Sequence, residues 1–274
     1  MTAMDRRLTP ANGRVAALEL AGKVAADRFV PGQGARVLRP VVDLLAAPDG
    51  ARERQLLAGE AVELFETYEG WGFVRAARDG YCGYIEAEAL GAPRAATHIV
   101  ATPATHLYAE ADIKSPDRAH LSFGSRITVL HELKTLFETP EGFIPKKHLR
   151  EIDRPFSDPV TVAQMFFGTP YLWGGNSRMG IDCSGLVQAA LLACGVPCPG
   201  DSDLQQTLGR DVGDDTPQRG DLWFWKGHVA MLVDPETIIH ANGHAMAVTY
   251  EDERKAALRI EAQGGGPVTH RRRL

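Results

Sequence analysis

The alternation of hydrophobic and polar residues divides the chain into three parts. Before residue 34 the apolar residues are mostly good helix formers, and the stretch at 30–34, Val-Pro-Gly-Gln-Gly, breaks the pattern. From residue 37 the apolar residues come in short runs bounded by turn residues, as small antiparallel sheets require. From residue 159 a pattern of helical length precedes more short runs. We therefore expect a helical arm and loop over residues 1–34.

The first β-rich part is expected to form one small barrel over residues 35–92. Turn sequences rich in Asp, Glu and Gly separate its apolar runs at 48–50, 69–70 and 79–80. The strands are expected at residues 37–45, 61–68, 72–76 and 83–85.

The second β-rich part, residues 93–153, repeats this texture. Its strands are expected at residues 98–101, 106–108, 126–130 and 136–139. The run Gly-Phe-Ile-Pro at 142–145 parallels Gly-Tyr-Ile at 83–85, which favours a divergent internal duplication over one irregular β-domain.

Residues 154–274 have the pattern of an α+β domain. Asp158 and Pro159 suit the N-cap and first turn of a helix whose apolar face ends at Gly168. A second helix, buried over 183–195, is closed by Gly195. Strand-like runs follow at 222–225, 228–233, 237–241 and 245–250. One buried helix on an antiparallel sheet gives the α+β class.

Composition narrows the possible partners and the compartment. The net charge of −5 comes from 30 basic and 35 acidic residues that are mixed along the chain, so nucleic acid is not an expected partner. The one basic run, at 270–273, is expected to be a frayed, solvated tail. No stretch approaches the about 18 consecutive apolar residues of a membrane span, and no apolar segment follows the N-terminal charges. We therefore expect a cytoplasmic protein without a membrane partner.

The 4 cysteines are too few and too scattered to staple a chain of this length, which agrees with a reducing compartment. Cys194 and Cys198 have the spacing of half a zinc site, but no second Cys or His pair at ligand spacing accompanies them. No metal is expected.

Cys183 is the candidate nucleophile. It begins the predicted buried helix, where unpaired backbone N–H groups and the positive end of the helix dipole favour a thiolate and lower the pKa of the thiol. The same N–H groups can stabilise a developing oxyanion, which acyl transfer also needs.

A thiolate nucleophile requires an imidazole, and the imidazole requires a group that orients its second nitrogen. His228 begins one predicted strand, and His240 lies near the end of the adjacent one. Pairing of these strands brings the two histidines together. His244, and less strongly Asn242, remain rivals for the orienting role.

These residues resemble the NlpC-type (NlpC/p60) cell-wall cysteine peptidases, whose fold is a circularly rearranged papain-like core. The resemblance covers about residues 159–251. It rests on six motifs in order, at residues 170–175 (Pro-Tyr-Leu-Trp-Gly-Gly), 182–187 (Asp-Cys-Ser-Gly-Leu-Val), 201–205 (Asp201, Ser202 and Gln205), 219–222 (Arg-Gly-Asp-Leu), 227–230 (Gly-His-Val-Ala) and 239–241 (Ile-His-Ala).

The resemblance implies that Cys183 is the nucleophile, His228 its base and His240 the orienting residue. It also implies that Tyr171 helps the oxyanion site. The residues it places along the substrate groove are Trp173, Asp182, Ser184, Asp201 and Ser202. A capping role for Asp182 at the helix start is equally open.

The upstream half resembles the bacterial SH3-type domains of γ-D-glutamyl-L-diamino acid endopeptidases, the dipeptidyl-peptidase VI group. The resemblance lies in residues 5–10, 52–60, 70–71 and 79–84. In that group the first SH3-type domain recognises the free amine of an N-terminal L-Ala, through an acidic residue and a tyrosine. Glu53 and Tyr81 best match those positions, with Tyr84 as a near alternative. A solvated surface role for Glu53 and sheet packing for Tyr81 are the simpler interpretations.

The sequence thus predicts an α+β, papain-like (NlpC-type) cysteine peptidase core after two small all-β SH3-like barrels. The resemblance implies murein stem peptides, L-Ala-γ-D-Glu-diamino acid, as substrates. It implies hydrolysis of the γ-D-Glu to diamino acid bond, without a metal or organic cofactor. Two alternatives stay open: an endopeptidase or amidase on intact cell wall with the barrels as wall-binding modules, and a non-catalytic peptide-binding scaffold.

Overall fold

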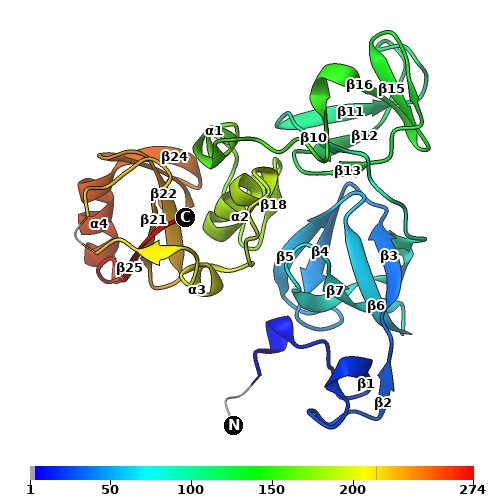
Figure 1. The fold of residues 1–274 in the computed structure, drawn as a ribbon, viewed down its shortest axis with the longest axis horizontal. Coiled ribbons are helices and arrows are strands. Elements are labelled where there is room, and N and C mark those ends of the chain that lie inside the picture. Colours follow the sequence, from blue (N-terminus) through cyan, green and yellow to red (C-terminus); the bar gives the residue numbers. More distant parts are fainter. Residues whose placement is uncertain (1–3, 214) are drawn as a thin grey trace. The chain divides into compact units, whose positions relative to one another are not determined.

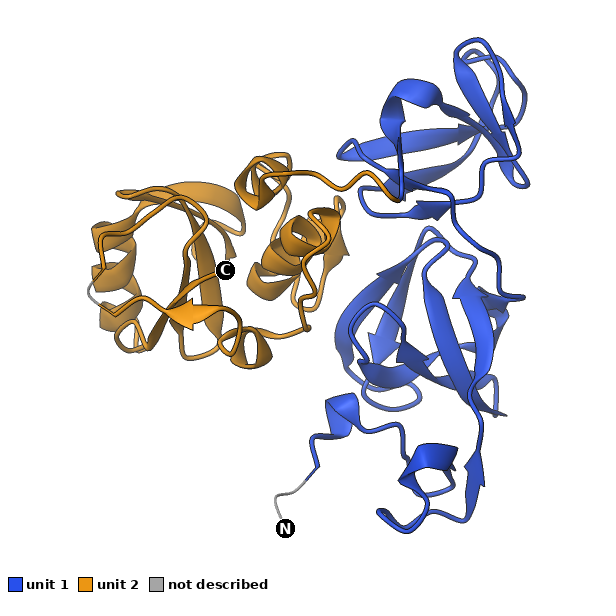
Figure 2. Ribbon diagram, in the orientation of Figure 1, with its two compact units in different colours: residues 1–152 blue, residues 153–274 orange. Residues whose placement is uncertain are grey.

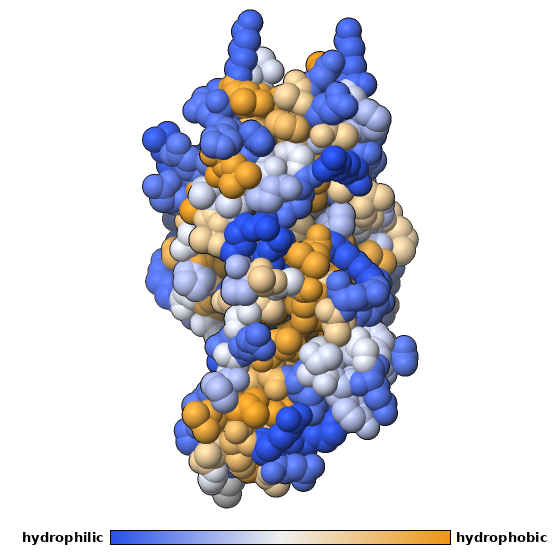
Figure 3. All heavy atoms as spheres, turned by 90° about the vertical axis from the view of Figure 1, so that its right-hand side faces the viewer, coloured by the Kyte–Doolittle hydropathy of each residue, from blue (hydrophilic) through white to orange (hydrophobic). Residues whose placement is uncertain are grey.

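A computed structural model describes residues 4–213 and 215–274 (Figure 1). The chain divides into two compact units, residues 1–152 and 153–274 (Figure 2). Within the described residues, no helix combines the length and the apolar character that crossing a membrane requires. One face of the molecule shows hydrophilic residues interspersed with hydrophobic ones (Figure 3), as the mixed charges along the chain lead one to expect.

The expected helical arm over residues 1–34 is wrong in its described part. Strand β1 (Val15–Ala17) pairs in parallel with β2 (Arg28–Val30), and only single 3-10 turns occur, at η1 (Arg6–Leu8) and η2 (Leu18–Leu20). All three residues of β1 are fully buried and belong to a cluster with Phe65 and Phe73. Three successive buried residues do not fit the single buried face of a surface helix, so tertiary burial overrides helix propensity here.

The first barrel is a seven-stranded sheet with the order β5-β4-β8-β7-β6-β3-β9. Its elements are β3 (Gln33–Val37), β4 (Val41–Leu45), β5 (Arg52–Leu57), β6 (Ala61–Tyr68), β7 (Trp71–Ala76), β8 (Cys82–Glu86), η3 (Ala87–Ala89) and β9 (Leu90–Gly91). The expected run at 37–45 is interrupted at 38–40. Strand β5 was not expected, because its first four residues, Arg-Glu-Arg-Gln, are all polar and show no alternation of apolar and polar residues. In the structure one of them, Arg54, is nevertheless fully buried.

The second barrel combines a five-stranded sheet, β12-β11-β16-β15-β14, with a three-stranded one, β13-β10-β17. Its elements are β10 (His98–Val100), β11 (Ala104–Tyr108), β12 (Asp117–Ser122), β13 (Arg126–Ile127), β14 (His131–Glu132), β15 (Leu136–Thr139), β16 (Gly142–Pro145), η4 (Lys146–His148) and β17 (Leu149–Glu151). Both barrels end in the succession strand, 3-10 turn, strand, which supports the internal duplication.

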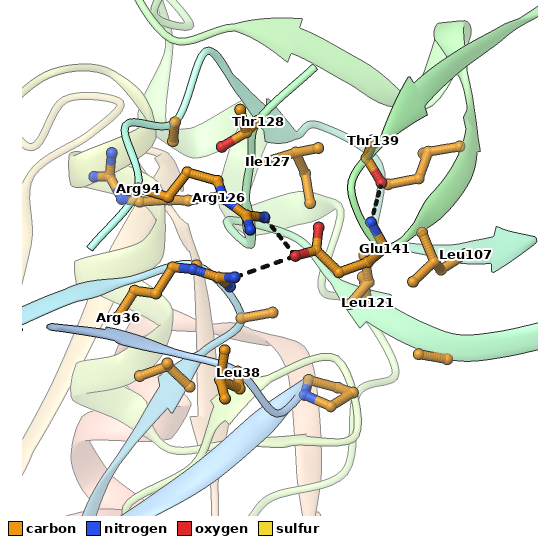
Figure 4. Close-up of a pocket in the computed structure, with 17 residues that line it drawn as sticks. Arg36, Leu38, Arg94, Leu107, Leu121, Arg126, Ile127, Thr128, Thr139 and Glu141 are labelled. Atoms are coloured by element: carbon orange, nitrogen blue, oxygen red, sulfur yellow. Dashed lines mark hydrogen bonds and ion pairs between the residues drawn. The ribbon is translucent and has the colours of Figure 1, made fainter. Parts of the chain in front are cut away.

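A small pocket of about 80 Å³ is lined by residues of both barrels (Figure 4). Glu141 accepts hydrogen bonds there from Arg36, at 3.2 Å, and Arg94, at 2.5 Å. The backbone N–H of Arg126 donates to the carbonyl of Ala58 at 2.8 Å. The contacts of Arg36 with Glu141 and of Arg126 with Ala58 join the two barrels within the first unit.

The second unit is built on a six-stranded sheet with the order β20-β25-β21-β22-β23-β24. Figure 1 shows this sheet between α4 on one side and α1 and α2 on the other. Its elements are α1 (Pro159–Gln164), β18 (Asn176–Ser177), β19 (Gly180–Ile181), α2 (Cys183–Ala193), α3 (Ser202–Gln205), β20 (Arg210–Asp211), β21 (Leu222–Trp225), β22 (His228–Asp234), β23 (Thr237–Asn242), β24 (Ala247–Asp252), α4 (Glu253–Ala262) and β25 (His270–Arg273). The α+β class and its papain-like arrangement after SH3-like domains are confirmed.

The basic run at 270–273 is not a frayed tail, as the sequence suggested. It forms β25, which pairs with β20 and β21 inside the sheet. The Arg273 guanidinium donates to both carboxylate oxygens of the fully buried Asp221 at 2.7 Å. Arg271 lies over the Trp223 ring, 4.4 Å from its centroid. Trp223 and Asp221 are 48 and 52 residues away along the chain from Arg271 and Arg273, so no local sequence pattern predicts these contacts.

Candidate active site

Helix α2 begins at Cys183 because Asp182 caps it. The Asp182 Oδ1 atom accepts the backbone N–H of Gly185 at 2.6 Å and the Ser184 hydroxyl at 2.9 Å. Its Oδ2 atom accepts the N–H of Gly174 at 2.9 Å. The capping role expected as one of two for Asp182 is thus present, and the same carboxylate fixes the 171–175 loop against the start of the helix.

Cys183 occupies the first turn of α2 and is 7% exposed. The orphan N–H groups of a helix start make this a favourable position for an anion. Helix α2 packs against β22 and β23, the two strands that carry His228 and His240. The predicted nucleophile therefore lies on a helix that packs directly against the two strands carrying the predicted base and orienting residue.

Tyr171 lies on the loop before the nucleophile. Its backbone N–H donates to the carbonyl of Met246 at 2.9 Å. Burial raises the pKa of the Tyr171 hydroxyl, and the negative charges of Cys183 and Asp182 raise it further. A phenol held protonated beside Cys183 can donate a hydrogen bond to an oxyanion.

Gly185 permits the close approach of loop and helix. A Cβ atom at this position would lie 2.5 Å from the Gly175 carbonyl oxygen and 3.1 Å from Asp182 Oδ1. We expect Gly185→Ala to lower the free energy of unfolding by about 1–3 kcal/mol, as overpacking does, and to reduce peptidase activity by displacing the cap. Urea unfolding and peptide hydrolysis measure the two effects.

Gly243→Ala is the matched control for stability, since a Cβ atom there meets nothing within 4 Å. If Gly185→Ala and Gly243→Ala unfold at the same urea concentration, the close approach at Gly185 has no energetic role.

The two predicted histidines are in contact. His228, the first residue of β22, places its Nε2 atom 2.9 Å from Nδ1 of His240 on β23. His240 is fully buried, and its Nε2 atom lies 3.2 Å from Oε2 of Glu251 on β24. The pairing of β22, β23 and β24 thus aligns three side chains in one relay.

Arg259 of α4 completes the relay. Its guanidinium donates two hydrogen bonds to the Glu251 carboxylate, at 2.9 and 2.7 Å. The hydrogen bond from His240 and the pairing with Arg259 lower the pKa of Glu251 to about 2. Glu251 is therefore an anion at neutral pH, and its carboxylate accepts a hydrogen bond from the N–H group at Nε2 of His240.

This network assigns the tautomers of both imidazoles. Since Glu251 accepts from Nε2–H of His240, Nδ1 of neutral His240 is an acceptor, and Nε2–H of His228 donates to it. Nδ1 of His228 then carries the lone pair. The relay leaves His228 with one nitrogen ready to take a proton, which is what a general base needs.

Glu251 and Arg259 were missed by the sequence reasoning. Glu251 reaches His240 because of the register between β23 and β24. In this register Ile238 lies opposite Glu251 and His240 lies opposite Thr249, so Glu251 is a diagonal neighbour of His240. A single acidic residue followed by an arginine eight positions later is not a recognisable motif. The signal lies in strand register, which depends on the folded sheet.

The two rivals for the orienting role have other positions. Asn242 donates to the Thr249 hydroxyl at 3.0 Å and accepts the N–H of Ala245 at 2.8 Å, so it shapes the turn after β23. His244 is exposed on that turn. Together with His228 it lines an open cleft of about 510 Å³.

The remaining predicted groove residues surround the start of α2 and α3. Trp173 is 69% exposed, as a residue that contacts a substrate can be. Asp201 has a positive φ of 44° and precedes the buried Ser202 at the start of α3. Gln205, fully buried, donates to the carbonyl of Ser184 at 2.9 Å and so joins α3 to the nucleophile helix.

The predicted amine-binding residues lie in the first barrel. One carboxylate oxygen of Glu53 pairs with Arg6, while Oε2 is buried and, within the described chain, has no hydrogen-bond partner. Tyr81 is 2% exposed and belongs to the hydrophobic cluster of that barrel. The Tyr84 ring lies 5.1 Å from Phe73. Glu53 therefore has unsatisfied polar capacity within the described chain.

We expect Glu251→Gln to lower kcat by at least about tenfold with little change in KM, because glutamine cannot stabilise a positive charge that develops on the histidine pair. Steady-state kinetics on a peptide substrate measure this split. Glu253→Gln, two residues further on in the first turn of α4, is the matched control. An unchanged kcat in Glu251→Gln would show that the carboxylate only supports the fold.

Comparison with known proteins finds a matching family model within each unit. Residues 168–260 match the NlpC/P60 family, and residues 44–90 match the bacterial dipeptidyl-peptidase SH3 domain. The chain is 29% identical to dipeptidyl-peptidase 6 of Lysinibacillus sphaericus over 253 residues, which are 81% of this chain and 93% of the relative. It is 30% identical to a γ-D-glutamyl-L-lysine dipeptidyl-peptidase of Bacillus cereus over 165 residues, 52% of this chain and 49% of the relative.

The fold also has a solved counterpart. The crystal structure of an NlpC/P60 family protein from Bacillus cereus superposes with a TM-score of 0.74 at 22% identity and covers 88% of this chain and 99% of that one. At this identity the similarity establishes the fold alone.

Proposed function

We propose a substrate for this protein from the premise that it contains an NlpC/P60 domain, preceded by a bacterial dipeptidyl-peptidase SH3 domain. We infer that it hydrolyses the bond between γ-D-Glu and a diamino acid in murein stem peptides with a free N-terminal L-Ala. The product is L-Ala-γ-D-Glu. The observation that carries the chemistry is the relay from Glu251 through His240 to His228, on strands packed against the helix that begins at Cys183.

The proposed reaction is an acyl transfer through a thioester. Cys183 attacks the γ-carbonyl of D-Glu while Nδ1 of His228 takes the thiol proton. Backbone N–H groups at the start of α2 and the Tyr171 hydroxyl stabilise the tetrahedral oxyanion. The protonated His228 then protonates the amine of the leaving diamino acid, and water, deprotonated by His228, hydrolyses the acyl-enzyme.

Selectivity for a free amine is assigned to Glu53. An ammonium group would satisfy the buried, unpartnered Oε2 atom of this carboxylate, whereas an acylated N-terminus has neither the charge nor the donors. Tyr81 is proposed to complete the cap, with Tyr84 as its alternative. Asp182, Asp201, Ser202, Ser184 and Trp173 are proposed to border the peptide in the second unit.

The test compares L-Ala-γ-D-Glu-meso-diaminopimelate with its N-acetylated counterpart. We expect release of L-Ala-γ-D-Glu from the free-amine peptide only. Glu53→Gln should raise KM for that peptide by at least about tenfold, whereas Glu86→Gln, an exposed carboxylate of the same barrel, should not. Equal cleavage of both peptides would refute the amine cap and leave the peptidase assignment standing.

We also propose a role in recycling of murein fragments in the cytoplasm. The competing function is cleavage of intact cell wall by an endopeptidase or amidase. Incubation with insoluble sacculi separates the two, since recycling predicts no soluble release, and fractionation of the native cells tests the compartment.

A further inference from the structure

Three side chains with metal-ligating atoms converge on the outer face of the second barrel, and none of them is among the residues proposed for hydrolysis. They are His106 on β11 and Asp117 and His120 on β12. One ligand atom from each lies within 4.8 Å of the other two. Nε2 of His120 is 3.1 Å from Oδ2 of Asp117, and the two imidazole centroids are 4.6 Å apart at 85°. All three residues are exposed, so an ion can reach them from solvent.

The strand pairing explains why the histidines meet. His106 and His120 are directly opposite each other in the antiparallel β11–β12 ladder. Their neighbours Leu107 and Leu121 point the other way and are buried in the barrel core, 8% and 6% exposed. Because side chains alternate along a strand, burial of these leucines holds both imidazoles on the solvent face.

A β-bulge adds the carboxylate. Leu107 is opposite Ala119, but the next residue, Tyr108, is opposite Asp117, so Arg118 is an extra residue in β12. In a regular strand Asp117 and His120, three residues apart, would lie on opposite faces. The extra residue reverses the alternation and places Asp117 on the face of His120, as bulges commonly re-aim a side chain.

We propose that His106, Asp117 and His120 bind a divalent transition-metal ion, with Zn²⁺ as the type. Two imidazole nitrogens and one carboxylate oxygen are a common zinc donor set at about 2.0–2.2 Å, with the fourth tetrahedral position left to water. The existing separations of the ligand atoms require only side-chain rotation to reach a shared ion. The site ties β11 to β12 and is not part of the peptidase chemistry.

Two neighbouring side chains that can carry positive charge have hydrogen-bond partners outside the cluster. Arg118, the nearest arginine in sequence, directs its guanidinium to the carbonyl of Glu141 at 2.8 Å. His148 contacts the hydroxyl of Thr105 at 2.8 Å, on the inner side of β11. Asp117 adds a carboxylate oxygen to the two imidazole nitrogens of the cluster.

The test is titration of chelator-treated full-length protein with ZnCl2 by isothermal calorimetry. All proteins carry Cys183→Ala, which removes the catalytic thiol as a competing ligand. We expect one Zn²⁺ per chain, with affinity lowered at least tenfold by His106→Gln and by His120→Gln, and lowered also by Asp117→Asn. His131→Gln removes an exposed histidine of the same barrel outside the cluster and should leave binding unchanged.

Thermal unfolding supplies a second readout that also reports folding. Without metal, the substituted proteins should unfold at the temperature of the Cys183→Ala parent, because the three side chains are exposed. With excess Zn²⁺ the parent should gain stability and the His106→Gln/His120→Gln double variant should not. Absence of binding by the parent, equal binding by the double variant, or an equal loss in His131→Gln would each overturn the proposal.

Discussion

Replacing Cys183 by alanine is expected to reduce hydrolysis of L-Ala-γ-D-Glu-meso-diaminopimelate by at least about a thousandfold in kcat/KM, since the thioester route disappears with the thiol. Chromatographic measurement of the released dipeptide gives the rate. The fold should be retained, because Asp182 continues to cap α2 through its bond to the Gly185 N–H. A scaffold protein that binds peptides without cleaving them would release no dipeptide even with Cys183 present, and Cys183→Ala would leave its function intact.

Cys194→Ala is the matched control, because Cys194 stands at the other end of the same helix. The buried Cys82 has a pKa raised to about 12 by desolvation, so it is a thiol at neutral pH and no substitute nucleophile. Comparable losses in Cys183→Ala and Cys194→Ala would locate the effect in the stability of α2 and not in catalysis.

Replacing His228 by glutamine is expected to cost about a thousandfold in kcat, because no other side chain then takes the thiol proton. Substrate binding should change little, so the loss should fall in kcat and not in KM. His244→Gln, on the rim of the same cleft, is the control and should retain most of the activity. Equal losses from the two substitutions would contradict the assignment of the base.

The protonation state of His228 gives this second prediction a direct physical signature. Burial and the neighbouring His240 lower the pKa of His228 from an ordinary 6.5 to about 3. In Cys183→Ala, where no thiolate can pair with the imidazole, NMR titration should find His228 neutral down to about pH 3. A midpoint near 6.5 would mean that the relay does not hold the neutral tautomer.

The same shift makes stability depend on pH. Between pH 6.5 and about 3 the unfolded chain binds a proton at His228 that the folded chain does not, so the free energy of unfolding falls as pH is lowered through this window. His228→Gln in the Cys183→Ala background should flatten that part of the profile. Urea unfolding at several pH values, compared between the two proteins, isolates the contribution of His228 from that of the carboxylates.

The relay adds a fourth residue, Glu251, behind the predicted nucleophile, base and orienting residue. His240, unlike a carboxylate, has two tautomers, and only one of them accepts from His228. Glu251 selects that tautomer and Arg259 keeps Glu251 ionised. A histidine in the orienting position therefore requires a group behind it, and the sheet and α4 together provide one.

The sequence by itself determined the features that depend on neighbours a few residues away. Asp182 before Cys183 and Asp158 before Pro159 mark helix starts, and both cap as expected. The strand at Leu222–Trp225 follows from its continuous apolar run, with the bounds that the pattern predicts. Cys183, His228 and His240 could be predicted as nucleophile, base and orienting residue because each lies near the end of a predicted helix or strand and within a motif of the family resemblance.

Only the tertiary structure decided the features that depend on strand register and distant charge pairs. The basic run at 270–273 became a sheet strand because Asp221 is buried opposite Arg273, and β1 formed because Phe65 and Phe73 cover it. Glu251 reached His240 through the pairing of β23 with β24, and a bulge turned Asp117 toward His120. Helix propensity and capping depend on residues within one or two turns of the chain. Strand register and ion pairing depend on burial across the whole sheet, so the local sequence pattern does not predict them.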